Sequence, residues 1–386
     1  MGTPSDYLPR SVSDDSIQEL LELVGLPRAT EIRSAAVTAQ YHAVYSITVP
    51  ASSHTTNREL VLRISGNHLP TIKTENEIAV MTWVSRNTNI PIPQVIAYDS
   101  TANNPIAHEY TLLSRVAGHT LSDVYPSLGQ DQIAHILDQL IDFLSQLQAH
   151  EFHAVGGLHL NKNDNQIEVS RTVDETFWQV PDIEQIWPQE TVDSLNVGGP
   201  YATYVDLISA QVRTYIRLIR IHGKLAFMRD AVPQLERFVQ SLQTHAEELN
   251  KVKLRLAHKD LHFANMLYDP ASGAITAVLD WEFAGVVPFT KWNPRRAFLW
   301  NARDDADSAD EKQRLLRLFQ SRCAEKGVEI LEDVAYASPL QESMQTVADF
   351  LRAITEVAPR GQGGSRAGLE GCCAGECRQI RAMIWQ

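Results

Sequence analysis

The sequence predicts an α+β fold in two lobes, a small antiparallel β-sheet lobe followed by a larger, mainly helical lobe. Residues 31–114 contain several short runs in which apolar residues alternate with a period of two, as in half-buried strands. After residue 118 the apolar residues recur mainly at helical spacing. Residues 256–285 then interrupt the helical pattern with a second hairpin that carries several polar side chains.

The composition limits the class of protein. With 386 residues, 44% of them hydrophobic, the chain can bury a core and form two lobes or two domains. Its 34 basic and 47 acidic residues give a net charge of −13, which argues against a nucleic-acid partner. The chain contains no run of 18 apolar residues and no apolar leader in MGTPSDYLPR, so we expect a cytoplasmic protein without a membrane partner.

The N-terminal part of the sequence predicts one helix and then a sheet. Residues 13–26 carry apolar residues at helical spacing, and Asp15 and Gln18 resemble a capping box. Strand-like runs follow at residues 44–49, 60–65, 94–98 and 109–114. The short connection at residues 115–118 has the position of a hinge between the two lobes.

A helix is predicted over residues 74–86, between the second and third of these runs. Ile78, Met81 and Val84 share its buried side. Glu77 on this helix lies 14 residues after Arg63 on the preceding strand. An interaction between the two side chains would join the helix to the sheet, either within a binding site or as an ordinary ion pair on the surface.

Long helices dominate the second lobe, with an irregular insert between the first two. Apolar residues recur at helical spacing in residues 131–148, 204–219 and 233–249. Residues 161–193 differ, because they hold eight acids, two bases, two tryptophans and no clean period. This insert suits recognition of a polar or cationic small molecule, but a solvated surface loop fits the composition equally well.

Residues 256–285 read LAHKDLHFANMLYDPASGAITAVLDWEFAG and predict a tight hairpin. Counting outward from its turn pairs Tyr268 with about Ile275 and Asn265 with about Val278. Asn265 and Asp280 should therefore lie at the same open end of the hairpin, with Asp260 just before the first strand.

The polar residues of this hairpin match a phosphotransfer template. His258, Asp260, Leu261 and Asn265 fit the kinase pattern H-x-D-L-x-x-x-N, in which the Asp receives the proton of the substrate hydroxyl. The Asn and a following Asp, here Asp280, supply oxygen ligands of the kind that Mg²⁺ prefers. The template also requires a strand Lys paired with a Glu on the following helix; Arg63 and Glu77 could fill those places, although Arg differs from Lys in reach and geometry.

The stretch LAHKDLHFANMLYD followed by LDWEFAG resembles the aminoglycoside phosphotransferase-like family of small-molecule kinases, which includes choline kinase-like proteins. The segments LVLRIS, TENEIAVMTWV, NIPIPQVIAYD and YTLLSRVAGHTL are similar to its fungal-type members. The resemblance implies a protein-kinase-like two-lobed fold that uses ATP and Mg²⁺ to phosphorylate a hydroxyl of a small molecule.

Carried over by position, the resemblance implies a role for each site residue. Asp260 would be the catalytic base, and Asn265 and Asp280 would hold Mg²⁺. Arg63 and Glu77 would orient the nucleotide phosphates. His258 would brace the loop through backbone hydrogen bonds, and structural positioning is expected of His262 and Glu282.

One departure from the family pattern leaves an alternative open. Residues 27–65 contain no glycine, so the loop at about residues 37–44 lacks the residue that lets backbone approach phosphates closely. The missing glycine and the Arg63 in place of Lys are also compatible with a pseudokinase, that is, a catalytically weak or inactive kinase-like protein with a binding or regulatory role.

The expected organisation has four parts. Residues 1–30 form an N-terminal helix, residues 31–117 a nucleotide-binding lobe, and residues 118–359 a helical lobe with the catalytic loop and the insert. Residues 360–386, with six glycines and three of the four cysteines, are expected to be a disordered tail. Those three cysteines have no matching ligand pair for a zinc site.

Overall fold

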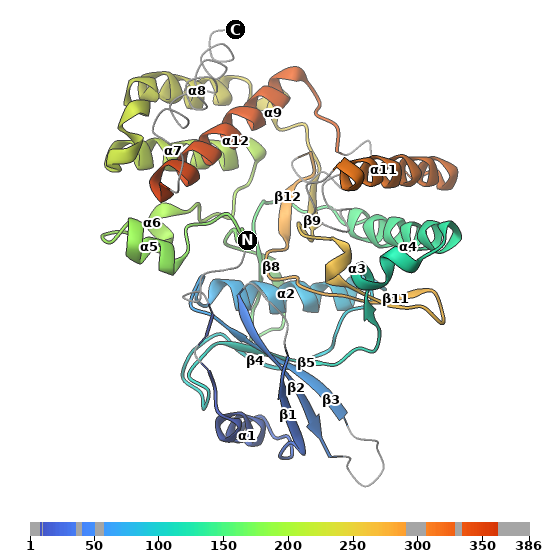
Figure 1. Cartoon of the computed structure of the whole chain (residues 1–386). Coiled ribbons are helices and arrows are strands. Elements are labelled where there is room, and N and C mark those ends of the chain that lie inside the picture. The colour runs from blue at the N-terminus through green and yellow to red at the C-terminus, as the bar shows by residue number, and fades with distance from the viewer. Residues whose placement is uncertain are drawn as a thin grey trace.

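The computed structural model describes residues 8–9, 11–35, 41–50, 58–290, 306–328 and 334–361, the side chains of residues 306–308 excepted. The predicted α+β architecture is confirmed: a five-stranded antiparallel sheet forms a small lobe, and a larger, mainly helical lobe lies beside it (Figure 1). The predicted loop over the phosphates falls partly in residues 36–40, outside the described residues, as does the predicted tail from residue 362 onward.

The small lobe is organised around its sheet, whose strands follow the order β1-β2-β3-β5-β4. Their bounds are β1 Glu31–Ser34, β2 His42–Val49, β3 Arg58–Ser65, β4 Val95–Asp99 and β5 Tyr110–Ser114. Each neighbouring pair is antiparallel. Alternation along β3 places Leu60, Leu62 and Ile64 in the core, which leaves Arg63 on the opposite face.

Helix α1 (Asp14–Leu23) packs on the apolar face of this sheet through Ile17, Leu20 and Leu21. Its N-cap differs from the predicted capping box. Ser13 Oγ accepts the backbone N–H of Ser16 at 3.2 Å, whereas Gln18 bonds the backbone of Ala29 in the following segment. Because the Gln18 side chain bonds the backbone of Ala29, it is not available to cap the start of α1, as its spacing from Asp15 had suggested.

Helix α2 (Ile72–Asn87) lies between the sheet and the helical lobe (Figure 1). Its buried residues include the predicted Ile78, Met81 and Val84, and also several polar side chains near its N-terminus. Most side chains in the first two turns of the helix are therefore buried. Helix α2 contacts both lobes, as its pairing with Arg63 of β3 and with Glu282 of the helical lobe shows.

In the described residues, the larger lobe consists of long helices around three short sheets, with strand orders β11-β10-β6, β12-β9 and β7-β8. Its long helices are α4 Gln130–Gln148, α7 Tyr204–Ile221, α8 Val232–Thr244, α11 Ala306–Lys326 and α12 Pro339–Arg360. Its shorter helices are α3 Leu121–Val124, α5 Val180–Ile186, α6 Val192–Leu195 and α9 Ala246–Leu249, with 3₁₀ turns η2 Tyr125–Ser127, η3 Gly223–Ala231 and η4 Phe263–Asn265. Its strands are β6 His119–Thr120, β7 Leu158–Leu160, β8 Ile167–Val169, β9 Leu254–Ala257, β10 Met266–Asp269, β11 Ala274–Val278 and β12 Gly285–Pro288. Among the described helices, none combines the length and apolarity needed to cross a bilayer.

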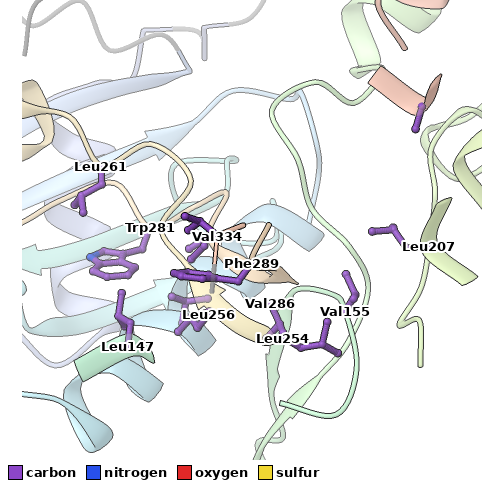
Figure 2. Close-up of a cluster of buried hydrophobic side chains, with 14 of the residues drawn as sticks. Leu147, Val155, Leu207, Leu254, Leu256, Leu261, Trp281, Val286, Phe289 and Val334 are labelled. Carbon is purple, nitrogen blue, oxygen red and sulfur yellow. The ribbon is translucent and has the colours of Figure 1, made fainter. Parts of the chain in front are cut away.

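A buried apolar cluster lies beneath the predicted catalytic hairpin (Figure 2). Leu256 precedes the H-x-D-L pattern and Leu261 is its last residue, whereas Trp281 and Phe289 lie after the hairpin. The Trp281 side chain is 1% exposed, and its Nε1–H donates to the carbonyl of Val278 at 3.1 Å. This packing fixes the backbone on both sides of the polar residues.

The insert is more ordered than its composition indicated. β7 and β8 pair as an antiparallel hairpin, and α5 and α6 follow them. Trp178 and Trp187 are each 3% exposed and stack edge-on with ring centroids 5.3 Å apart. The two tryptophans therefore belong to the core of the helical lobe, and Phe177 and the acidic side chains of the insert remain as candidates for recognition.

Candidate active site

The catalytic hairpin forms with nearly the predicted register. β10 and β11 are antiparallel, and Tyr268 pairs with Ile275 as predicted. The prediction for Asn265 is wrong by one residue, because Met266 is the partner of Val278 and a bulge lies between Leu267 and Tyr268. Asn265 instead accepts the backbone N–H of Leu279 at 2.8 Å, so its side chain still lies at the Asp280 end of the hairpin.

Asp260 and Asn265 contact each other directly. The amide nitrogen of Asn265 donates to Asp260 Oδ2 at 3.0 Å and to the Asp260 carbonyl at 2.9 Å. With its nitrogen used in this way, the Asn265 side-chain oxygen is the atom left to contact a cation. The Asp260 side chain is 45% exposed, so the pair stands open to a substrate.

His262 approaches the same carboxylate. Its Nε2 lies 3.3 Å from Asp260 Oδ2. Burial opposes the charged form of both groups, but their mutual contact outweighs it: the pKa of His262 is raised and the pKa of Asp260 is lowered from their ordinary values. Asp260 is thus held as a carboxylate, and its Oδ1 is the oxygen left for an incoming hydroxyl.

His258 braces the catalytic loop as expected. Its fully buried ring lies against Trp281, with centroids 4.5 Å apart. Burial lowers the pKa of His258, so the ring is neutral, its Nε2–H donates to the Leu279 carbonyl at 2.7 Å, and Nδ1 accepts the Asp260 N–H at 3.3 Å. One ring therefore ties the loop before Asp260 to the strand before Asp280.

Two residues of this region have left-handed backbone without being glycine. Lys259 has φ of 69° and Asp280 has φ of 65°. Such conformations are uncommon for residues with a Cβ and persist where the surroundings impose them, often at functional sites. Here they follow His258 and Leu279, the two residues joined by the imidazole hydrogen bond, and they place Asp260 and Asp280 at the same end of the hairpin.

Arg63 connects the small lobe to the Asp280 end of the hairpin. Its guanidinium pairs with Glu77 and lies 2.8 Å from Asp280 Oδ1. The Arg63 side chain is 15% exposed and that of Glu77 is 2% exposed, so the alternative of an ordinary surface ion pair is wrong. Burial opposes its charge, but the surrounding carboxylates raise the pKa of Arg63 above its ordinary value. The structure thus brings all five predicted site residues together.

Sequence reasoning missed two lysines at the site. Lys259 precedes Asp260, and its ammonium donates to the Val173 carbonyl at 2.6 Å and to Asp174 Oδ2 at 3.2 Å, which ties the catalytic loop to the insert. Lys73 of α2 is buried against Glu282. The H-K-D order could have drawn attention to Lys259, but Lys73 resembles an ordinary residue of a helix surface.

The oxygen donors fit Mg²⁺ in kind. The Asp280 carboxylate is 34% exposed and, with the Asn265 side-chain oxygen, provides hard ligands at the same end of the hairpin. In the part of the chain that the structure describes, no group of three or more His, Cys, Asp or Glu side chains could hold a metal ion alone. Mg²⁺ that arrives with a nucleotide needs fewer protein ligands, because phosphates and water complete its shell.

A pocket opens beside the catalytic loop, in the helical lobe. It is lined by the insert, α7, α12 and the loop itself, and its polar side chains include Asp174, Tyr215, Lys259, Arg352 and Glu356. Burial, reinforced by nearby carboxylates, raises the pKa of Glu356 to about 7. The pocket therefore holds both carboxylates and cations within a partly apolar wall, and Asp174 is already paired with Lys259.

The chain is similar in sequence to known proteins. A subtelomeric hrmA-associated cluster protein of Aspergillus fumigatus is 23% identical over 257 residues, covering 56% of this chain and 50% of that protein. The clavilactone A biosynthesis cluster protein Y of Ampulloclitocybe clavipes is 27% identical over 234 residues, covering 56% of this chain and 51% of that protein. The chain thus spans about half the length of these relatives.

The fold is also similar to a solved structure. The streptomycin–ATP–APH(2")-IIa ternary complex aligns with a TM-score of 0.52 at 12% identity, covering 97% of this chain and 99% of that one. At this identity the likeness concerns the fold alone. The family model described as the phosphotransferase enzyme family matches residues 51–291, more than half of the chain, and this range includes all five predicted site residues. The chain belongs to the phosphotransferase enzyme family.

Proposed function

We propose that this protein is an ATP-dependent small-molecule kinase that transfers the γ-phosphate of ATP to a hydroxyl group. The observation that carries the proposal is that the Arg63–Glu77 pair of the small lobe meets Asp280 at the end of the hairpin where Asp260 and Asn265 lie. Family membership supports phosphotransferase chemistry in general. The arrangement adds a carboxylate base, hard oxygen ligands and a cation suited to phosphates.

Asp260 is the base in this proposal. Its Oδ2 is occupied by Asn265 and His262, so Oδ1 receives the hydrogen bond of the acceptor hydroxyl. The lowered pKa of Asp260 makes it a weak base that accepts the proton late in transfer. Most of the acceleration then comes from holding the hydroxyl in line with the phosphate.

Asn265 and Asp280 would hold Mg²⁺, and Arg63 would contact the nucleotide phosphates. When bound, the cation supplies charge neutralisation for the phosphate oxygens. The Arg63 guanidinium presents several donors in a plane, which suits phosphate oxygens. Its contact with Glu77 fixes the direction from which those donors approach.

The acceptor in this proposal occupies the pocket beside Lys259, and a cationic hydroxyl compound suits it best. Glu356 lies in this pocket, with its carboxylate 3.8 Å from Arg352 Nε. That separation is too long for a hydrogen bond, so the carboxylate remains able to pair with an amine. Phe177 and Tyr215 line the same pocket and supply aromatic surface for the rest of the compound.

The test is phosphate transfer from labelled ATP with Mg²⁺ to a panel of amino alcohols, aminosugars and neutral sugars. We expect transfer to at least one compound and a loss of roughly 10²–10⁴-fold in turnover for Asp260→Ala, the usual contribution of a positioned base. Asp131→Ala, an exposed acid on α4, is the matched control and should keep turnover.

Two results would contradict the proposal. Normal turnover of Asp260→Ala would remove Asp260 as the base. Binding of ATP by the unmodified chain without transfer to any compound would favour the kinase-like binding protein over the enzyme.

A further inference from the structure

Lys73 is among the most deeply buried charged side chains of the described residues. It lies in the first turn of α2 and is 2% exposed. Lysine is almost never fully buried in a folded protein unless its ammonium is paired. The side chain therefore has to be explained by what it contacts.

Its contacts come from both lobes. The ammonium pairs with Glu282 of the helical lobe and lies 2.8 Å from His42 Nε2 on β2. An ammonium can only donate, so His42 Nε2 accepts. Burial, with the charges of Lys73 and Arg63, lowers the pKa of His42 and keeps the ring neutral. Lys73 is thus the cation that faces the buried Glu282 carboxylate most closely.

Glu282 also lies near Arg63. Its Oε2 is 3.8 Å from Arg63 Nη2, the same nitrogen that lies 2.8 Å from Asp280 Oδ1. Without Lys73, Arg63 would be the nearest cation to a carboxylate that is only 3% exposed. An unpaired buried charge is costly, so Arg63 would be drawn toward Glu282 and away from Asp280.

Attachment of this segment to α2 does not require Lys73. Asn76, one turn along the helix, donates to the carbonyls of Glu282 at 3.0 Å and Ala284 at 2.9 Å. It also accepts the backbone N–H of Leu158 at 2.8 Å. Asn76 therefore holds the backbone of the segment that contains Glu282 against α2. The role that remains for Lys73 is electrostatic.

We propose that Lys73 is a positioning residue of the nucleotide site, whose ammonium neutralises Glu282 and so keeps Arg63 shared between Glu77 and Asp280. The inference rests on the proposed function in one respect, that Arg63 contacts the nucleotide phosphates. It assigns a role to a lysine that lies outside the template positions. It also explains why Glu282 is tolerated beside Asp280 in a buried place.

The first experiment measures the affinity for ATP with Mg²⁺ by calorimetry in a double-mutant cycle. Lys73→Met should raise the dissociation constant about tenfold, a size typical of coupled charged groups. In the Glu282→Gln background the same substitution should cause no weakening, because the carboxylate that Lys73 neutralises is gone. Equal weakening in both backgrounds would overturn the proposal.

Controls separate this role from a general loss of structure. Lys73→Arg keeps the charge and should restore at least part of the lost affinity, whereas failure to exceed Lys73→Met would argue against neutralisation. Lys253→Met removes an exposed lysine that lies 3.5 Å from Glu151 in the helical lobe. It should leave affinity unchanged.

A crystal structure of Lys73→Met without nucleotide tests the same proposal independently of any activity. Arg63 should leave Asp280 and contact Glu282; an Arg63 that still joins Glu77 and Asp280 would overturn the proposal. If Lys73→Met does not fold, Lys73→Met/Glu282→Gln has no unpaired charge and should fold with Arg63 in place. Should the unmodified chain bind no ATP, the proposed function fails and this structural comparison still decides the role of Lys73.

Discussion

The open end of the catalytic hairpin and the charge cluster between the lobes both contain acidic side chains, but in opposite environments. At the hairpin, the side chains of Asp260 and Asp280 are 45% and 34% exposed. Between the lobes, Glu77 and Glu282 are 2% and 3% exposed. Solvent can stabilise the first two carboxylates, whereas the other two depend on protein cations.

The difference indicates a division of labour. The hairpin groups come from one short stretch of chain and can meet a substrate and a metal ion. The buried groups come from β2, β3, α2 and the segment after the hairpin, and they fix how the two lobes face each other. Changes at the hairpin should therefore affect chemistry, and changes in the buried cluster should affect stability as well.

The largest expected effect on stability is at Glu77. Glu77→Ala leaves Arg63 without its closest buried partner, and we expect a loss of about 3 kcal/mol in the free energy of unfolding, measured by urea titration. Asp260→Ala is the matched truncation at the open site and should change that free energy by less than about 1 kcal/mol. Similar losses for the two variants would show that the regions do not differ as proposed.

A smaller loss is expected at Asn76, which holds the backbone between the two regions. Asn76→Ala removes three buried hydrogen bonds and should lower the free energy of unfolding by about 1–3 kcal/mol. Asn87→Ala is the control, because this amide at the end of the same helix bonds only the Trp83 carbonyl. Equal effects in thermal or urea melts would contradict a specific role for Asn76 between the lobes.

The smallest effect is expected from substitution of His262, and we expect it to appear as a change in the pH dependence of the reaction rate. The His262 pKa is raised in the fold and that of Asp260 is lowered, so their contact stabilises the protein between those two titrations. The contribution is lost when pH falls through the Asp260 pKa or rises through the His262 pKa. His262→Gln should raise the Asp260 pKa and move the acid limb of the pH–rate profile to higher pH.

A control variant in the same pH–rate measurement tests the role of His262. His222→Gln alters a histidine in the helical lobe whose ring packs on Trp187, away from the catalytic hairpin. That variant should give the wild-type acid limb. An unchanged acid limb for His262→Gln would mean that this imidazole does not tune Asp260.

Much of the fold and site could be predicted because the signals are local. The alternation in residues 60–65 predicts a strand that places Arg63 opposite the apolar face, and the structure confirms it. The hairpin turn likewise places Asn265 near Asp280, although a bulge at Leu267 shifts the register by one residue. Counting along a regular strand does not reveal such a bulge.

Other features depended on distant parts of the chain. Lys73 and Glu77 are four residues apart on α2, the spacing of an ordinary pair on a helix surface. In the structure both are buried and each contacts a different partner, Glu282 and Arg63 respectively. The composition of the acidic insert similarly did not reveal that the insert contains a hairpin and two buried tryptophans.

The sequence by itself determined the two-lobed fold class and the catalytic hairpin, because both rest on short spacings or regular periods, and the kinase template indicated the contact of Arg63 with Glu77. Only the tertiary structure decided that Lys259 joins the insert and that Lys73 lies against Glu282, 209 residues away. The physical reason is burial. Whether a charged side chain meets water or a buried partner depends on what packs over it, and for Lys73 that is a segment from the other lobe.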